Sequence, residues 1–120
     1  MSQERRLHPR ATVRLSAELL FAGEAEWDQA LLHDLSAGGA AVHASRSFSG
    51  QSEVRLRYRL PDNAGRGSRE IETLCLVVRT GDPRVHDPAR PFVAGLHFLD
   101  LLGEDFDAVR AFVWSLVHPS

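Results

Sequence analysis

Apolar and polar residues alternate along most of this chain, and the alternation predicts β-strands. From Thr12 to Leu19 the odd positions are apolar and the even positions are polar, as expected of a strand with one buried face. The alternation is cleanest from Val54 to Leu60, where apolar residues alternate with three arginines. Further strands are predicted at Trp27–Leu35, Ala40–Ala44, Ile71–Thr80 and Phe92–Phe98. The segments between the strands contain many Gly, Pro, Asn, Asp and Ser residues, which favour turns.

The hydrophobic period changes near the C-terminus. Apolar residues recur there at steps of three and four, which predicts an amphipathic helix from about Glu104 to about Val117. Six short strands followed by one helix predict a mainly all-β fold, a closed or nearly closed antiparallel barrel that the helix caps or flanks. No repeat or second domain is visible, so residues 12–120 are predicted to form one domain.

Composition is that of a soluble globular protein. Of the 120 residues, 43% are hydrophobic and 25% are charged, and no apolar run is long enough to span a membrane. The single cysteine, Cys75, cannot form an internal disulfide, and we interpret it as a small core residue. Together these features predict a cytoplasmic protein, in a reducing compartment, without membrane insertion.

The charge is unevenly distributed. Residues 1–14 carry four arginines and one glutamate, whereas residues 95–120 carry four acidic residues and one arginine. Residues 1–11 show no hydrophobic period and are predicted to form a flexible basic arm. The acidic C-terminal part argues against nucleic-acid binding. All 14 basic residues are arginine, so an arginine indicates a function here only where its position is also special.

Two short motifs meet that condition. Arg6 and Arg10 form an R-x-x-x-R with Arg5 in front of it, and residues 34–39 read D-x-S-x-x-G. Guanidinium groups bind phosphates and the O6 and N7 acceptors of guanine. A carboxylate can accept hydrogen bonds from the N1–H and N2–H₂ donors of guanine. Alone, the first motif is often a solvated tail and the second often a turn; their joint occurrence favours a binding site.

Both motifs, in this order and around these strands, resemble the binding signature of the PilZ domain family. The resemblance covers most of the chain and implies a six-stranded Greek-key barrel with cyclic di-GMP on its outer wall. It implies ligand contacts from Arg6 and Arg10 and from Asp34, Ser36 and Gly39. By this resemblance, Asp34 accepts hydrogen bonds from guanine and Ser36 adds a hydroxyl contact to the ligand. Gly39 lets the backbone approach a flat ring.

Two further arginines are assigned through the same resemblance. An arginine at the position of Arg5 goes with two stacked cyclic di-GMP molecules in this family. Arg79 stands where many relatives have a stacking residue, and an arginine plane can stack on a base. Whether one or two ligand molecules bind is left open at this point.

The predicted function is that of a non-enzymatic bacterial receptor for cyclic di-GMP. The ligand would order the basic arm against the barrel, and an unidentified partner protein would respond. The first alternative is a PilZ-like interaction module, related to pili or motility, that binds no nucleotide. A nucleic-acid binder and an enzyme are the remaining alternatives. We expect no catalytic residues and no cofactor other than the ligand.

The remaining polar and aromatic residues receive ordinary structural interpretations. The six histidines show no metal-ligand spacing, so no metal site is predicted. His33 is next to Asp34 but is interpreted as a strand residue that faces solvent. Arg55, Arg57 and Arg59 are assigned to the solvent face of their strand, and Trp27 and Trp114 are interpreted as core aromatics.

Overall fold

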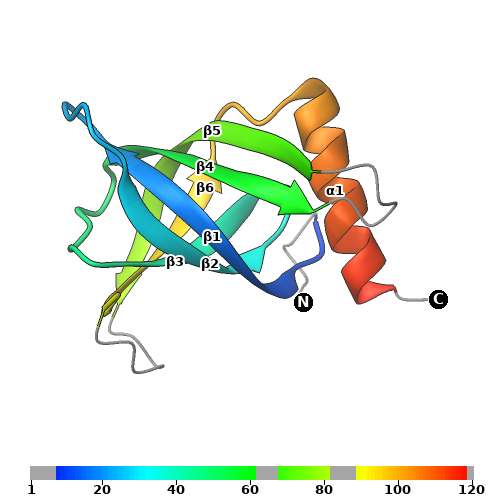
Figure 1. Cartoon of the computed structure of the whole chain (residues 1–120), viewed down its shortest axis with the longest axis horizontal. Coiled ribbons are helices and arrows are strands. Elements are labelled where there is room, and N and C mark those ends of the chain that lie inside the picture. The colour runs from blue at the N-terminus through cyan, green and yellow to red at the C-terminus, as the bar shows by residue number, and fades with distance from the viewer. Residues whose placement is uncertain (1–7, 62–67, 82–88, 119–120) are drawn as a thin grey trace, which may run out of the picture.

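The alternating segments form the strands of a barrel (Figure 1). The structure is a computed structural model, and it describes residues 8–61, 68–81 and 89–118. Within these residues the elements are β1 (Ala11–Phe21), β2 (Asp28–Leu35), β3 (Gly39–Ala44), β4 (Glu53–Pro61), β5 (Ser68–Gly81), β6 (Phe92–Phe98) and α1 (Gly103–Val117). Every predicted strand and the predicted helix are therefore present, with boundaries that differ by up to three residues.

Antiparallel pairing closes the strands into a barrel in the order β1-β2-β3-β6-β5-β4. β1 pairs with β2 along one side and with β4 along the other, from Ala17 to Phe21. Consecutive strands β1, β2 and β3 are neighbours, and β4 returns to lie beside β1. This order, 4-1-2-3, is a Greek key, so the predicted antiparallel Greek-key barrel with a C-terminal helix is confirmed.

The barrel interior is filled by the inward-facing residues of each strand. On β4 these are Val54, Leu56, Tyr58 and Leu60, all buried, as the alternation predicted. Burying a large apolar side chain stabilises a fold by roughly 1.5–3 kcal/mol, so the summed burial holds the strands together. Cys75 is also a buried core residue, as predicted, and burial raises the pKa of its thiol to about 12.

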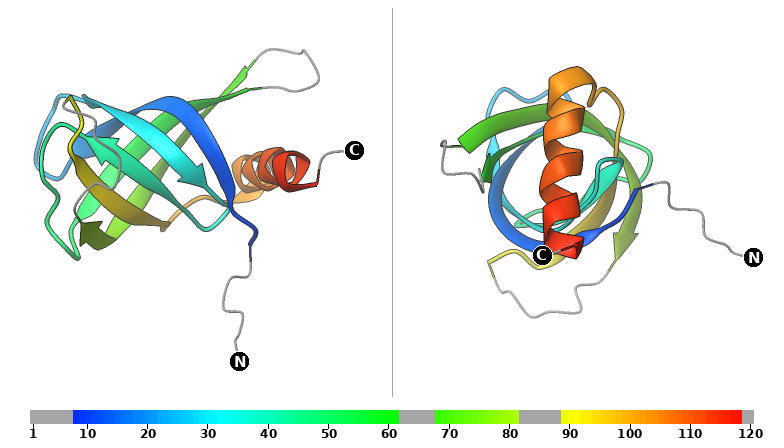
Figure 2. Two further views of the ribbon diagram at one scale, coloured as in Figure 1. Left: turned by 90° about the horizontal axis from the view of Figure 1, so that it is seen from below. Right: turned by 90° about the vertical axis from the view of Figure 1, so that its right-hand side faces the viewer.

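Helix α1 lies across one open end of the barrel (Figure 2). Val109 and Val113 face the barrel and are buried. Arg69 of β5 holds the first turn of the helix through ion pairs with Glu104 at 3.5 Å and Asp105 at 2.9 Å. The helix therefore closes the interior at this end and excludes water from the core.

Both tryptophans depart from the predicted core positions. Trp114 is 56% exposed on the outer face of α1, because only one stripe of the helix faces the barrel. Trp27 is half-buried outside the barrel, where the guanidinium carbon of Arg57 lies 4.0 Å from the centre of its ring. The prediction was wrong for Trp114, and Trp27 packs under a cation instead of inside the core.

Three irregularities interrupt the ladders of the strands that the structure describes. An extra residue lies in β1 between Thr12 and Leu15, against β2. Another lies in β2 between Leu32 and Asp34, against β3, and a third lies in β5 between Val77 and Arg79, against β6. Such bulges change the direction of the following side chains. In the part of the chain that the structure describes, no helix is long and apolar enough to cross a membrane.

Candidate ligand-binding site

The bulge in β2 directs Asp34 to the outer wall of the barrel. Leu32 and Leu35 are both fully buried, although they are three residues apart. In a regular strand such residues face opposite sides. The ladder accommodates them because Leu32 pairs with Val42 and Asp34 pairs with Ala41, which leaves His33 as the extra residue. His33 and Asp34 consequently both lie on the outside.

Arg10 meets Asp34 across 24 residues of sequence. Arg10 Nη1 donates to Asp34 Oδ2 at 2.9 Å, and each side chain is 29% exposed. Arg10 Nε and Asp34 Oδ1 are buried, and neither has a hydrogen-bond partner among the described residues. Arg10 and Asp34 thus form an ion pair, and each partner keeps one polar atom for a further contact.

The structure describes the predicted arm from His8 onward. Arg5 and Arg6, the other predicted arm contacts, lie outside the described residues. His8 packs against the site: a Cβ atom on Gly38 would lie 3.2 Å from its Cδ2 atom, and its ring centre is 5.6 Å from that of Phe106 in α1. Ala11, assigned to the arm by sequence, is the first residue of β1 and is buried.

Ser36 organises the turn between β2 and β3. Its hydroxyl oxygen accepts from the backbone N–H groups of Gly38 and Gly39, both at 3.1 Å, and the hydroxyl donates to the Gly39 carbonyl at 3.3 Å. Ser36 is also buried. The hydroxyl is therefore engaged by the turn in this structure, and its predicted contact with the ligand stays a prediction.

Gly39 is required by the packing of β3 against β6. A Cβ atom at this position would lie 2.3 Å from the carbonyl oxygen of Leu96, which is far inside any real contact. The resemblance implied that this glycine lets the ligand approach closely. The structure gives a different reason for it, namely the close approach of a neighbouring strand.

One row of residues runs across the outer wall from Asp34 to Arg79. The register pairs Asp34 with Ala41, Ala41 with Gly95, and Gly95 with Arg79. Three strand spacings separate the ends of this row, about 14 Å between backbones. The two residues between the ends are the smallest amino acids, and both are buried, with Arg79 lying over Gly95. We call this row, Asp34, Ala41, Gly95 and Arg79, the trough.

Arg79 lies over the floor of the trough. A Cβ atom on Gly95 would be 3.1 Å from Arg79 Nε and 3.3 Å from its Nη2. The bulge in β5 sets this position, since Val77 is buried while Val78, the extra residue, is 44% exposed. The planar guanidinium group is thereby placed on the same wall as the Arg10–Asp34 pair.

Two histidines beside the trough were not recognised from sequence. His33, predicted to face solvent, is half-buried, and its ring centre lies 4.3 Å from that of His43 on β3. His43 is only 6% exposed, although it faces outward. Burial is the main cause that lowers the pKa of His33; the neighbouring His43 lowers it further, and Asp34 opposes both.

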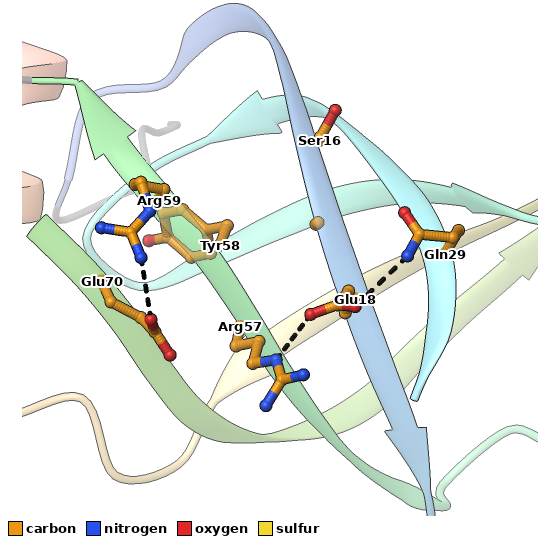
Figure 3. A pocket seen from close by; sticks show the side chains of 8 residues that line it. Ser16, Glu18, Gln29, Arg57, Tyr58, Arg59 and Glu70 are labelled. Carbon is orange, nitrogen blue, oxygen red and sulfur yellow. Dashed lines mark hydrogen bonds and ion pairs between the residues drawn. The ribbon is translucent and has the colours of Figure 1, made fainter. Parts of the chain in front are cut away.

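A second hollow, of about 450 Å³, lies where β1 and β4 diverge, and Figure 3 shows its lining. Glu18 accepts from Arg57 at 2.6 Å and from Gln29 at 3.2 Å, and Arg59 pairs with Glu70 at 3.1 Å. These contacts place the arginines of β4 on the outer face, as predicted. The acidic and basic side chains of this hollow pair with one another. It therefore offers no unpaired charged-group atom comparable to Arg10 Nε or Asp34 Oδ1.

Residues 8–61, 68–81 and 89–118 contain no group of three or more His, Cys, Asp or Glu side chains that could hold a metal ion. The polar atoms at the trough are instead donors and acceptors suited to a ligand with hydrogen-bonding edges and negative charge.

Comparisons with known proteins agree with this fold. The family described as "PilZ domain" matches residues 4–114. Among solved structures, the inhibitor of motility of Bacillus subtilis (MotI/DgrA) is 25% identical, with a TM-score of 0.76; the alignment covers 92% of this chain and 50% of that protein. This chain therefore spans about half the length of that relative.

Two smaller PilZ structures match over nearly their whole length. The PilZ domain of YcgR from Escherichia coli, solved with c-di-GMP, is 14% identical with a TM-score of 0.68, over 95% of this chain and 92% of that one. The PilZ domain of CeSA from a cellulose-synthesizing bacterium is 21% identical with a TM-score of 0.62, over 92% and 99% of the two chains. Curated proteins gave no match.

Proposed function

Because this chain belongs to the PilZ domain family, we propose that it is a non-enzymatic bacterial receptor that binds cyclic di-GMP along the trough. One observation carries the proposal: the ion pair of Arg10 and Asp34 leaves a buried donor and a buried acceptor unused at one end of a flat wall. Buried polar groups are rarely left without partners in native proteins, so a ligand that satisfies both is the natural complement. The c-di-GMP complex of the YcgR domain supports this class of ligand.

The chemistry of guanine fits these open atoms. Asp34 Oδ1 can accept from the N1–H or N2–H₂ group of a guanine base, and Arg10 Nε can donate to a guanine acceptor or a phosphate oxygen. Ala41 and Gly95 have no long side chain that would block a flat base, and Arg79, which lies over Gly95 in this structure, would move to admit it. Arg79 would stack on that base, and Arg5 and Arg6 would close over the phosphates.

The proposed response to the ligand passes through the N-terminal residues. His8 lies between the turn at Gly38 and Phe106 of α1. Ordering of the arm would therefore change the packing at both the turn and the helix. A partner protein in the cytoplasm would then recognise the altered face. The resemblance to an inhibitor of motility gives the alternative, an interaction module that acts on a partner without nucleotide.

Calorimetric titration tests the proposal directly. Cyclic di-GMP should bind with a Kd of about 1 μM or lower, equivalent to about −8 kcal/mol, and saturation should give two ligands per chain if Arg5 acts as expected. Cyclic di-AMP and GTP should bind much more weakly, because adenine has no N1–H for Asp34 and GTP has one base. Equal affinity for the two cyclic dinucleotides, or no heat of binding with cyclic di-GMP, would reject the proposal.

Arg79 provides a test of the far end of the trough. Arg79→Ala should weaken cyclic di-GMP binding by about fivefold to a hundredfold, since stacking contributes roughly 1–3 kcal/mol per base. Arg79→Lys keeps the charge but loses the plane, and should recover only part of the affinity. The control is Arg59→Ala, which removes an exposed, ion-paired arginine from the second hollow. Unchanged affinity in Arg79→Ala would remove this residue from the site.

A further inference from the structure

The His33–His43 pair adjoins the trough on the same outer wall. His33 is the extra residue of the β2 bulge, directly before Asp34, and His43 is two residues from Ala41 on β3. Their ring centres are 4.3 Å apart and the rings are inclined by 58°. The two imidazoles are therefore in contact with each other and next to the place where the proposed ligand would lie.

Neither imidazole has its Nδ1 atom engaged. Among the described residues, five buried side-chain nitrogen or oxygen atoms have no hydrogen-bond partner, and four of these belong to Arg10, Asp34, His33 and His43. The open polar atoms of the molecule are thus concentrated at this wall. The pair differs from the arginines because an imidazole can gain a charge near neutral pH.

The charged groups around the pair come from three strands. Asp34 follows His33 on β2 and is ion-paired to Arg10, which directly precedes β1, and β1 contributes Arg14 in the bulge opposite His33. β5 contributes Arg79 across Gly95. The β6 residues paired with His43 and Ala41 are Val93 and Gly95, which carry no charge. Protonation of His33 is opposed first by burial and then by His43, whereas Asp34 favours it.

Resting on the proposed function, we propose that the His33–His43 pair takes up a proton when the dianionic ligand occupies the trough, so that affinity rises as the pH falls. The negative phosphates would offset the burial and the cationic neighbours that disfavour imidazolium. Two positive charges at this separation repel one another, so one proton is taken up by the pair and not two.

The direction of the pH dependence follows from linkage. Burial lowers the pKa of His33 in the free protein, and bound phosphate raises it. At a pH between the lower pKa of the free protein and the higher pKa of the complex, the complex holds more protons than the separate protein and ligand. Each pH unit decrease in this window therefore tightens binding, by at most about tenfold for one proton. The same lowered pKa destabilises the empty fold as the pH falls below the ordinary histidine value, since the unfolded chain then binds more protons.

The test is calorimetry with cyclic di-GMP on the whole chain at about pH 8, 7 and 6, in two buffers of different ionisation enthalpy. We expect Kd to fall by about threefold to tenfold over this range, and the difference between buffers to show uptake of up to one proton. Neither the phosphodiesters nor the guanines of the ligand titrate here. Proton uptake is measured on the unaltered protein, so this readout is independent of any variant's folding.

Variants assign the effect to the pair. His33→Gln and His43→Gln should bind with little dependence on pH, whereas the control His118→Gln, at the end of α1 beside Trp114, should behave like the unaltered protein. Binding without proton uptake, or an unchanged pH slope in both pair variants, overturns this inference and leaves the proposed function intact. Absence of binding at every pH overturns both.

Discussion

Asp34→Ala should weaken binding of cyclic di-GMP by about tenfold to a hundredfold or more, and Arg10→Ala should do the same. Each substitution removes a charge-assisted hydrogen bond to the ligand, which contributes roughly 1.5–3 kcal/mol. Each also leaves its partner in the ion pair misplaced. Because the two residues contact one another, the double variant should lose less affinity than the product of the single losses.

Calorimetry on the variants measures these losses, and the chain offers a matched control. Asp28, at the other end of β2, is ion-paired with Arg46 and is 30% exposed, nearly the same as Asp34. Asp28→Ala should leave affinity unchanged. The stability cost of all three variants should be about 1 kcal/mol or less, as for other partly exposed ion pairs. Equal losses of affinity in Asp28→Ala and Asp34→Ala would contradict the assignment, as would unfolding of Arg10→Ala.

Gly39→Ala should produce the largest loss of stability among the single substitutions considered. The new Cβ atom would meet the Leu96 carbonyl oxygen, and a backbone atom in a paired strand cannot move aside. β3 and β6 would have to separate where Gly39 pairs with His97. Overpacking of this kind costs about 1–3 kcal/mol or more, and Gly39→Val should cost more because its side chain is larger.

Urea denaturation followed by circular dichroism measures this loss, and thermal melting should show a fall of roughly 4–8 °C per kcal/mol. Gly50→Ala is the control, since a Cβ atom at Gly50 would contact nothing within 4 Å. A midpoint for Gly39→Ala equal to that of the control would show that the strands can move apart freely. Reduced ligand binding in a destabilised Gly39 variant would report on folding and not on a direct contact.

The hydrophobic periods along the chain were sufficient to predict the strands and the helix, and the number of strands indicated a closed or nearly closed barrel. It could not predict the bulges, because the break in alternation at residues 32–35 does not show whether the strand ends, bends or carries an extra residue. The direction of Asp34 depends on Leu32 and Leu35 both reaching the core, and that requirement is set by the partner strands. Trp114 was misplaced for a related reason: helical periodicity does not show how wide a stripe the barrel can cover.

The candidate site was partly predictable. The motifs assigned Arg10 and Asp34 to one site, and the structure brings these two side chains together. The resemblance led to Arg79, whose contact with the ligand stays a prediction. The present engagement of Ser36 and Gly39 in the turn and the strand pair depends on distances that spacing alone cannot give. His33 and His43 were missed because their contact arises from the register of β2 on β3. Two histidines ten residues apart in a predicted strand–turn–strand segment were the available signal.

Closure of the barrel has a consequence for how this chain folds. β1 pairs with β4, and β3 pairs with β6, so its ladders join segments that are far apart in the sequence. Domains dominated by such pairings fold slowly, typically in milliseconds to seconds. The trough crosses β2, β3, β6 and β5, which are brought together only when the last strand has been synthesised and docked. A nascent or truncated chain that lacks β6 would carry both arginine and aspartate motifs and yet have no wall on which to hold a ligand.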